Sequence, residues 1–384
     1  MLIVLCVSKM AKNRFIVLDS FRGICAVCVV MYHLHWVGSL AEIDFFRGSG
    51  IFVEFFFVLS GFVLAHGYGF RESLNFKEFV RSRFFRLYPL HLFMLLVFVA
   101  LEFGKWMVME WFGFSFNNQP FSNDYSLDEF VPNLLLVHAC TPLTNPLSFN
   151  TPSWSISIEF YTYLLLFLTI VWARKFKPLI WAIIPSAIFM LDYYEMNLLV
   201  APVMRGLSCF FGGAFCYVIF KNNHHRVSQL GTSLSSFIEV GLVVAVVAFV
   251  QSDIPYRSLV APPLFCATVL WFALEKGVLS VWLKGRVFQL LGKLSYSIYM
   301  THAAIIYLMT SLMLVLQKLT GLEVAPMVDG VRFFTTGYAT VNSIIVLMIL
   351  AMVVFCSYWT YHLVELKGLQ VSKSFAGYKF ARSG

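Results

Sequence analysis

The sequence has 384 residues, of which 59% are apolar and only 12% are charged. The mean hydropathy of +0.78 excludes an ordinary water-soluble domain of this length, and apolar runs of about 20 residues, each long enough to cross a bilayer, recur along the whole chain. The net charge of +8 is dispersed over short loops and forms no single basic stripe, which argues against nucleic-acid binding. We therefore expect an all-α, polytopic integral membrane protein surrounded by the lipid bilayer.

Residues 1–14 precede the first long apolar run and are expected to form a cytoplasmic N-terminal segment. The short apolar stretch from Leu2 to Val7 follows no basic residue and precedes no small-residue cleavage site, so it is not typical of a signal peptide. Met10 is as acceptable a translation start as Met1.

Long apolar runs predict ten transmembrane helices that together form one transmembrane domain, residues 15–364. The predicted spans are residues 15–37, 49–69, 87–109, 155–173, 177–193, 201–221, 232–250, 257–275, 293–316 and 340–364. Residues 365–384 are then expected to form a short, basic cytoplasmic tail.

The distribution of Lys and Arg predicts the orientation of the chain. Ten spans place both termini on one side, and the termini and connections of that side hold 21 of the 28 basic residues. The opposite connections hold Arg47, Arg257, Lys318 and Arg332. Because basic loops remain in the cytoplasm, we expect both termini to be cytoplasmic.

The longest connection, roughly residues 110–153, is predicted to lie outside and contains no Lys or Arg. It is either a cover over a site on that face or a plain connector. Cys140 is the only cysteine expected in an outer loop, and the CxxC of Cys25 and Cys28 has no second pair. We expect neither a disulfide framework nor a metal site.

The first predicted span contains ionisable residues whose burial in a membrane is costly, which makes them candidates for function. Asp19, Arg22 and His33 occur in LDSFRGICAVCVVMYHLHW. Eleven residues at about 100° each return His33 to within roughly 20° of the Arg22 face, about 16 Å further along the helix axis. One helix face thus connects the cytoplasmic end with the outer half of the membrane. A purely structural interhelical histidine is the alternative.

Glu54 lies near the outer end of the second predicted span, at a depth that should match His33. A carboxylate that accepts a hydrogen bond from one imidazole nitrogen fixes the tautomer and leaves the other nitrogen free to take a proton from a hydroxyl. We therefore predict a catalytic pair in which Glu54 orients His33. The alternative is a structural role for Glu54.

Arg83 and Arg86 are three residues apart in RSRFFRLYP and are expected on one side of a helix that ends at Pro89, near the cytoplasmic surface. Guanidinium groups bind phosphate oxygens through paired hydrogen bonds, so these residues and Arg22 are predicted to hold an anionic cofactor. Anchoring of the cytoplasmic loop by positive charge is the alternative.

Trp154 and Glu159, in TPSWSISIEFYTY, are expected together at the outer end of the fourth predicted span. An indole ring can cover a sugar ring and a carboxylate can accept hydrogen bonds from sugar hydroxyls, so this pair is predicted to bind a sugar substrate. The ordinary aromatic belt of the membrane interface is the alternative for Trp154. Other polar residues in later spans receive no assigned role: Arg205, Ser295, Tyr296, Tyr299 and His302.

Five motifs, in order, resemble the membrane-bound acyltransferase-3 family, whose members acylate bacterial surface polysaccharides and related glycans. The similar segments extend over nearly the whole chain: LDSFRGICAVCVVMYH, FFFVLSGFVL, the RxxR of Arg83 and Arg86, WSISIEF, and SYSIYMTH. The chain departs from the family pattern at Glu54, where Asp is frequent, and at Phe160, where an acidic residue or Gln is frequent.

The resemblance implies that residues 15–364 are an acyltransferase domain in the bacterial cytoplasmic (inner) membrane. It implies an acyl-CoA donor, usually acetyl-CoA, held from the cytoplasm at Arg22, and a sugar or glycan acceptor at His33. His33 would act either as a general base or as a nucleophile that forms an acyl-histidine. A transporter or flippase for a glycan or a small anion is the alternative function, because polar stripes in helix bundles also line transport paths.

Overall fold

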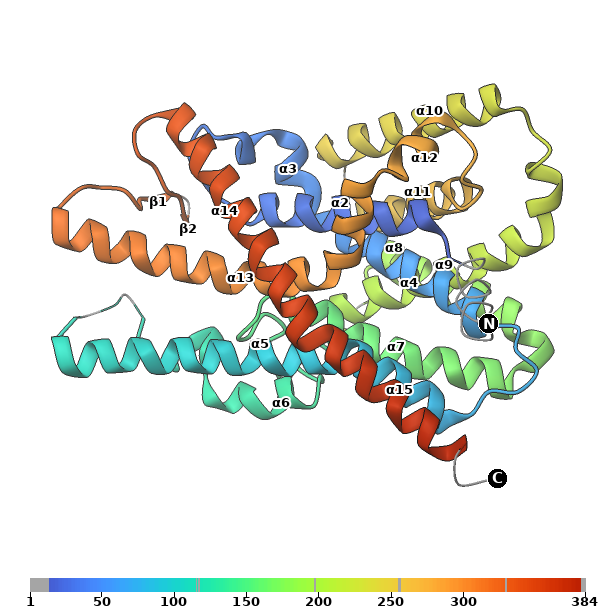
Figure 1. Ribbon diagram of the computed structural model, residues 1–384, viewed down its shortest axis with the longest axis horizontal. Coiled ribbons are helices and arrows are strands. Elements are labelled where there is room, and N and C mark those ends of the chain that lie inside the picture. The colour runs from blue at the N-terminus through green and yellow to red at the C-terminus, as the bar shows by residue number, and fades with distance from the viewer. Residues whose placement is uncertain are drawn as a thin grey trace.

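The computed structural model describes residues 14–380 apart from 115, 117, 197, 255, 256 and 329, with side chains described as far as residue 375. Regular structure in this part of the chain is almost entirely helical (Figure 1). The strands in it are β1 (Met327–Val328) and β2 (Val331–Arg332), which pair as an antiparallel hairpin. The predicted all-α fold is confirmed. Of the predicted N-terminal segment, all but Arg14 lies outside the described residues.

Every predicted span contains a helix. These helices are α2 (Ile16–Tyr32), α4 (Phe52–Tyr68), α5 (Phe76–Phe112), α7 (Ser153–Trp172), α8 (Lys177–Tyr193), α9 (Ala201–Val227), α10 (Thr232–Gln251), α11 (Arg257–Phe272), α13 (Arg286–Thr320) and α14 (Ala339–Thr360). In the described chain, eight helical segments are long and apolar enough to cross a membrane, and α11 is a shorter apolar helix. The 17 residues of α2 extend about 26 Å at 1.5 Å per residue. The protein is thus a multi-pass membrane protein, as predicted.

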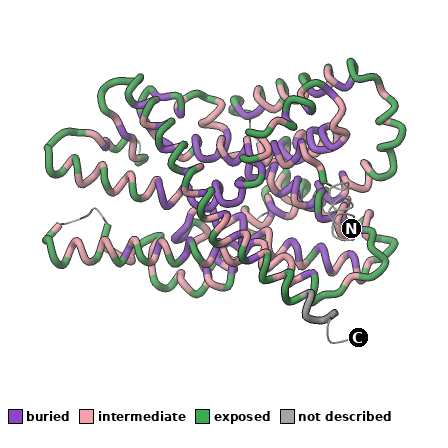
Figure 2. Tube along the Cα trace, viewed as in Figure 1, coloured by how far each residue is buried: buried purple, intermediate pink, exposed green. Residues whose placement is uncertain are grey.

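Two pairs of helices approach closely at the centre of the bundle, α4 with α9 and α2 with α13. A Cβ on Gly61 of α4 would collide with the Phe210 carbonyl oxygen of α9, and a Cβ on Gly23 of α2 would collide with the backbone of Gly292 in α13. Because glycine has no side chain, these backbones pack in direct contact. Figure 2 shows the buried residues concentrated in this central region. The contacts fix the rotation of α2 and α4, which carry candidate site residues.

The helix α5 continues beyond Pro89, so the prediction that it ends there is wrong. It begins after Asn75, whose side chain accepts a hydrogen bond from the Glu78 amide at 3.2 Å, and it runs for 37 residues. Proline removes one backbone hydrogen bond, whereas Leu87 and Leu90 on either side of it are buried in the bundle. This packing keeps the helix continuous.

The helix α14 continues into α15 (Leu366–Phe380) through a π turn, Tyr361–Glu365. The predicted boundary between membrane domain and tail, after residue 364, falls inside this turn. Single π turns within α-helices frequently occur at functional positions. Here the Glu365 side chain lies in the protein interior and is 1% exposed.

The long connection between α5 and α7 is folded into a cap. Asn133 of this cap donates a hydrogen bond to Ser148 at 2.8 Å, and Asn150 donates one to the Met300 carbonyl of α13 at 3.1 Å. Of the two alternatives for this connection, the structure favours a cover over the bundle. The short pieces in this and the other connections are η1 (Leu40–Glu42), α3 (Asp44–Gly48), η2 (Ser49–Ile51), η3 (Asn123–Tyr125), η4 (Leu127–Glu129), α6 (Phe130–Leu134), η5 (Arg174–Phe176) and α12 (Val278–Leu283).

Candidate functional site

The C-terminal end of α2 carries a pair of histidines in ring contact. His33 directly follows α2 as its C-cap residue, and its Nδ1 lies 2.9 Å from the Val29 carbonyl oxygen. Because a carbonyl can only accept, Nδ1 carries the proton and Nε2 is left as a base. The His302 ring of α13 lies 5.0 Å from the His33 ring, centroid to centroid. We call this end of the bundle the histidine end.

His302 is a candidate residue for which no role was predicted from the sequence. Its side chain is fully buried, and in the described structure neither ring nitrogen has a hydrogen-bond partner. An unpaired buried imidazole costs free energy, which ordinary packing does not explain. The sequence shows a histidine inside an apolar helix, which is unusual. The structure adds that this histidine contacts His33.

Glu54 does not contact His33 in the described structure, so the predicted orienting hydrogen bond is wrong. Its Oε1 instead accepts a hydrogen bond from Nε of Arg205 in α9 at 2.7 Å and forms an ion pair with Nη2 of the same residue, also at 2.7 Å. Glu54 is seven residues before Gly61, two helical turns, and therefore shares the face of α4 that packs against α9. The Val29 carbonyl orients His33 in its place.

The same guanidinium group of Arg205 connects Glu54 to Trp154. It lies over the Trp154 indole, 4.9 Å from the ring centroid. The second oxygen of Glu54, Oε2, is buried and has no partner among the described contacts. An ionised carboxylate can only accept, so this oxygen can take a hydrogen bond from a hydroxyl group.

At the opposite end of the bundle, which we call the arginine end, the structure brings Arg22, Arg83 and Arg86 to one cavity of about 90 Å³. Arg83 donates hydrogen bonds to the Tyr68 hydroxyl at 3.3 Å and to its neighbour Ser82 at 2.9 Å. Arg22 is held more loosely, 3.6 Å from an Asp19 oxygen, and 32% of its side chain is exposed. Three guanidinium groups around one cavity form a site for an anion.

Arg86 is held by Glu365 of the π turn. The two side chains form an ion pair, and Ser297 of α13 donates a hydrogen bond to the other Glu365 oxygen at 2.9 Å. The Arg86 guanidinium also lies 5.8 Å from the Tyr296 ring centroid. Glu365 thus fixes the direction of Arg86. No local sequence pattern indicates this contact, because the two residues are far apart in the chain.

Glu159 lies with the arginines and not beside Trp154, which corrects the predicted sugar-binding pair. Its carboxylate accepts hydrogen bonds from Ser60 and from Tyr163. Five residues at about 100° each turn Glu159 roughly 140° away from Trp154 around α7, so the two side chains leave the helix in different directions.

A second, narrower cavity of about 50 Å³ leads from the arginine end toward the histidines. The two cavities share four lining residues: Arg22, Ser60, Glu159 and Tyr296. The narrower one reaches Ser155 and Tyr299, whose side-chain oxygens are 3.0 Å apart. The Tyr299 ring lies 6.0 Å from the His302 ring. Polar side chains therefore form a continuous line from the three arginines to the histidine pair.

The described residues contain no group of three or more His, Cys, Asp or Glu side chains that could hold a metal ion. Cys25 and Cys28 are buried free thiols.

The fold is thus a bundle of membrane helices in which an arginine cluster and a histidine pair are joined by a narrow path. A family model described as an acyltransferase domain matches residues 15–362. The chain belongs to this acyltransferase family. Membership favours acyl transfer over the transporter alternative.

Three curated proteins are similar to parts of the chain. Acyltransferase MdmB of Streptomyces mycarofaciens is 34% identical over 36% of this chain and 30% of its own length. Protein 2 in the picA locus of Rhizobium radiobacter is 39% identical over 24% of this chain and 48% of its own length. The ORF330 protein of Acidianus two-tailed virus, whose name assigns it provisionally to the acetyltransferases, is 25% identical over 83% of this chain and 90% of its own length. No solved structure matches the chain.

Proposed function

We propose that the protein transfers an acyl group, in the first instance acetyl, from acyl-CoA to a hydroxyl of a cell-surface polysaccharide or a lipid-linked glycan. The observation that carries this proposal is the line of polar side chains and cavities between Arg22, Arg83 and Arg86 at one end and His33 at the other. In this proposal the arginine end faces the cytoplasm of a bacterium, both termini lie there, and the protein resides in the inner membrane.

The donor would bind at the arginine end. Its phosphates would pair with Arg83 and Arg86, and with the more exposed Arg22. The cavities are too small for a nucleotide, so the nucleotide would remain at the cytoplasmic mouth. The thin pantetheine arm would follow the path past Glu159, a distance on the order of the 16 Å between the levels of Arg22 and His33 on α2.

The acceptor would bind at the histidine end, where Trp154 and the Glu54–Arg205 pair offer an apolar ring and charged hydrogen-bonding groups. Nε2 of His33 would remove the proton from the acceptor hydroxyl while the oxygen attacks the thioester carbonyl carbon. The C–O bond forms, the C–S bond breaks, and the imidazolium returns the proton to the leaving CoA thiolate. The products are an ester and CoA thiol.

An acyl-histidine route uses the same atoms in two steps. Nε2 of His33 attacks the thioester, CoA thiolate leaves, and the acceptor hydroxyl then displaces the imidazole. His302 would serve as the base in the second step, because its ring lies beside His33. Trapping of an acyl-protein after rapid quenching distinguishes the two routes.

The proposal is tested by transfer and hydrolysis of radiolabelled acetyl-CoA by purified protein in nanodiscs. Wild type is compared with His33→Ala and Arg22→Ala, and with the matched controls His225→Ala and Arg226→Ala, which alter exposed residues at the end of α9. We expect His33→Ala to abolish turnover, Arg22→Ala to weaken donor binding, and both controls to retain activity. A folded wild-type protein that binds no acyl-CoA would overturn the proposal.

A further inference from the structure

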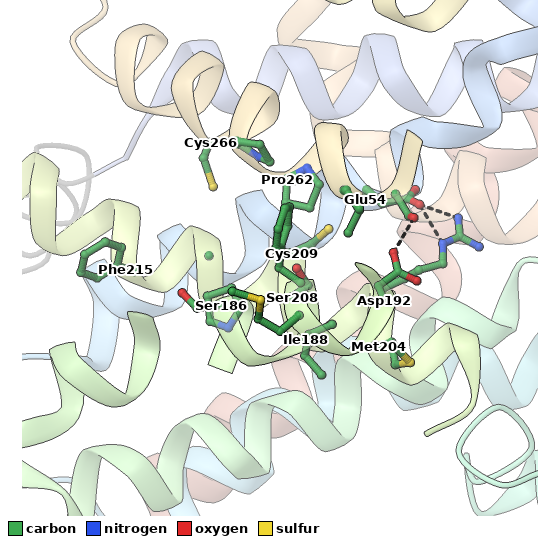
Figure 3. A pocket seen from close by; sticks show the side chains of 18 of the residues that line it. Glu54, Ser186, Ile188, Asp192, Met204, Ser208, Cys209, Phe215, Pro262 and Cys266 are labelled. Atoms are coloured by element: carbon green, nitrogen blue, oxygen red, sulfur yellow. Dashed lines mark hydrogen bonds and ion pairs between the residues drawn. The ribbon is translucent and has the colours of Figure 1, made fainter. Parts of the chain in front are cut away.

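A further cavity in the described structure lies to one side of the acyl-transfer path. It has a volume of about 650 Å³ and lies among α8, α9 and α11, with Glu54 of α4 at one end (Figure 3). That volume falls within the range of about 300 to 1,000 Å³ typical of small-molecule sites. We call this cavity the slot. The proposed acceptor site involves only its Glu54 and Arg205 end, so most of the slot has no role in acyl transfer.

The slot reaches the outer side of the bundle at α8. Within the most apolar stretch of α8 only 11% of residues are buried, against 61% for α9, so α8 is a peripheral helix and α9 an interior one. Phe189 and Met190, which line the slot from α8, are both exposed. Since this part of α8 lies in the bilayer, a molecule can enter the slot sideways from the lipid.

The slot is polar at one end and apolar at the other. Glu54, Asp192 and Arg205 are its charged lining residues and gather at the histidine end, where Asp192 also accepts a hydrogen bond from Ser258 at 2.8 Å (Figure 3). Phe215 lies ten residues beyond Arg205 on α9, about 15 Å further along the helix axis. That far end has no charged lining residue. An amphiphile fits this arrangement, with its polar head group at the charged end and its long hydrocarbon chain at the uncharged end.

The polar end favours an uncharged, hydroxyl-rich head group. Glu54 and Asp192 lie there with the Arg205 guanidinium, and Arg257 also acts on Glu54, so these charges balance and leave no excess positive charge to hold a phosphate. The buried Oε2 of Glu54 has no partner in the described structure and accepts from a hydroxyl. Arg205 also lies over Trp154, next to Ser155 on the transfer path, so a head group at this end lies beside the proposed acceptor site.

We infer that the acyl acceptor is a glycolipid with an uncharged sugar head, and that its hydrocarbon chain occupies the slot among α8, α9 and α11. This inference rests on the proposed function and chooses the lipid-linked class of acceptor. The chain enters between α8 and α11, and the sugar is held between the Glu54–Arg205 pair and Trp154. Bulk phospholipid is the competing occupant.

The first test measures binding without catalysis. A dodecyl glucoside that carries a diazirine in its alkyl chain is photolysed with the protein in phosphatidylcholine nanodiscs, and labelled peptides are mapped by mass spectrometry. We expect saturable labelling of the α9 and α11 segments around Phe215 and Cys266, displaced by dodecyl glucoside and not by phosphatidylglycerol. Unsaturable labelling spread over all lipid-facing helices, or equal displacement by phosphatidylglycerol, would overturn the inference.

Gly212 of α9 provides a variant that fills the slot. A Cβ there would lie 3.5 Å from Cys266 Sγ, which is ordinary contact, so a side chain can be added at this lining position in Gly212→Phe and in the milder Gly212→Leu. The matched control is Gly241→Phe on α10, where a Cβ meets nothing within 4 Å. We expect Gly212→Phe to reduce saturable labelling at least tenfold and Gly241→Phe to change it less than twofold. Unchanged labelling in both Gly212 variants contradicts the inference.

A second measurement separates this inference from the proposed function. Acetyl transfer to dodecyl glucoside is compared with transfer to methyl glucoside, which has the same head group and no chain. We expect Gly212→Phe to lower the former at least tenfold and the latter less than twofold, with acetyl-CoA binding unchanged as evidence of folding. If wild type labels in the slot and transfers nothing, the proposed function fails and the lipid site remains. If transfer is equal for both acceptors in every variant, the slot inference fails alone.

Discussion

The arginine end and the histidine end of the bundle were both visible in the sequence, but only the arginine end has the neighbours predicted for it. At the arginine end, three predicted residues line one cavity. At the histidine end, Glu54 turns to Arg205 and leaves His33 to a backbone carbonyl and to His302. Arginines that lie at the same depth can line one cavity in several helix orientations. A hydrogen-bonded pair forms only when both helices have the correct rotation.

The two ends of the bundle act through different kinds of interaction. The arginine end would act through long-range attraction and through several replaceable charged hydrogen bonds. The histidine end depends on buried groups whose partners cannot be exchanged without leaving a polar atom unpaired. Substitutions at the two ends should therefore differ in whether they affect donor binding, acceptor transfer or folding.

The largest expected effect is loss of donor binding in the double variant Arg83→Ala/Arg86→Ala. Two charge-assisted hydrogen-bonding groups, each worth about 1.5 to 3 kcal/mol, are removed, so acetyl-CoA affinity should fall at least about 100-fold. Binding is measured by isothermal titration calorimetry or scintillation proximity in nanodiscs. The variant Arg226→Ala, in the exposed end of α9, should bind normally. Equal loss of acetyl-CoA affinity in both variants would show that the positive charge of the protein matters and the position of Arg83 and Arg86 does not.

A double-mutant cycle tests the corrected partner of Glu54. Glu54→Ala removes the carboxylate partner of Arg205, whose side chain is 35% exposed, and should cost about 1 to 3 kcal/mol. The cycle with Arg205→Ala should show a coupling energy of about 1 to 3 kcal/mol, and the cycle with His33→Ala close to none. Thermal or denaturant unfolding in detergent is measured for all six proteins: wild type, the three single variants and the two double variants. Coupling to His33 instead of Arg205 would restore the predicted catalytic pair.

The sequence was a good guide to the helices, because apolar runs report burial in lipid directly. Every predicted span contains a helix, and RxxR spacing placed Arg83 and Arg86 at one cavity. The end predicted at Pro89 was wrong because a proline's local cost is small beside the packing of a long helix in a bundle. Local sequence patterns therefore predict where a helix lies better than they predict where it ends.

The contacts between helices were harder to predict, because they depend on which face each helix turns inward. Glu54 and Gly61 share a face, and the close contact of Gly61 with α9 decides the partner of Glu54. The separation of Trp154 from Glu159 follows from a rotation of roughly 140° and was open to calculation from spacing alone. The Arg86–Glu365 pair joins residues 279 positions apart and no local pattern contains it.

Glu365 offers a way to weaken the arginine end without touching an arginine. In Glu365→Gln the amide loses the ion pair with Arg86 while the side chain keeps its size and its contact with Ser297. Arg86 should lose its fixed direction, so the KM for acetyl-CoA should rise about tenfold, roughly 1.4 kcal/mol, while kcat changes little. The control Glu323→Gln alters an exposed residue after α13. An unchanged KM, or a lowered kcat at an unchanged KM, would exclude a positioning role.

The smallest expected effect concerns the cap over the histidine end. Burial, and then the neighbouring His91, lower the pKa of His138 to about 3, while its contacts with Pro132 and Ser153 oppose the shift. In the unfolded chain the pKa of histidine is about 6.5. The unfolded state therefore binds more protons between these values, and His138 contributes stability at neutral pH that is lost as pH falls below about 6.5.

Between pH 6.5 and 5.5 this linkage amounts to about 1 kcal/mol for one histidine. The variant His138→Asn should therefore lose less stability than wild type over that interval, even where it is less stable at pH 7.5, because the amide does not titrate. The melting temperature measured at both pH values gives the difference, and His225→Asn, at an exposed position, should behave like wild type. If His138→Asn is as acid-sensitive as wild type, the cap does not depend on a neutral His138, and the acid sensitivity arises elsewhere in the bundle.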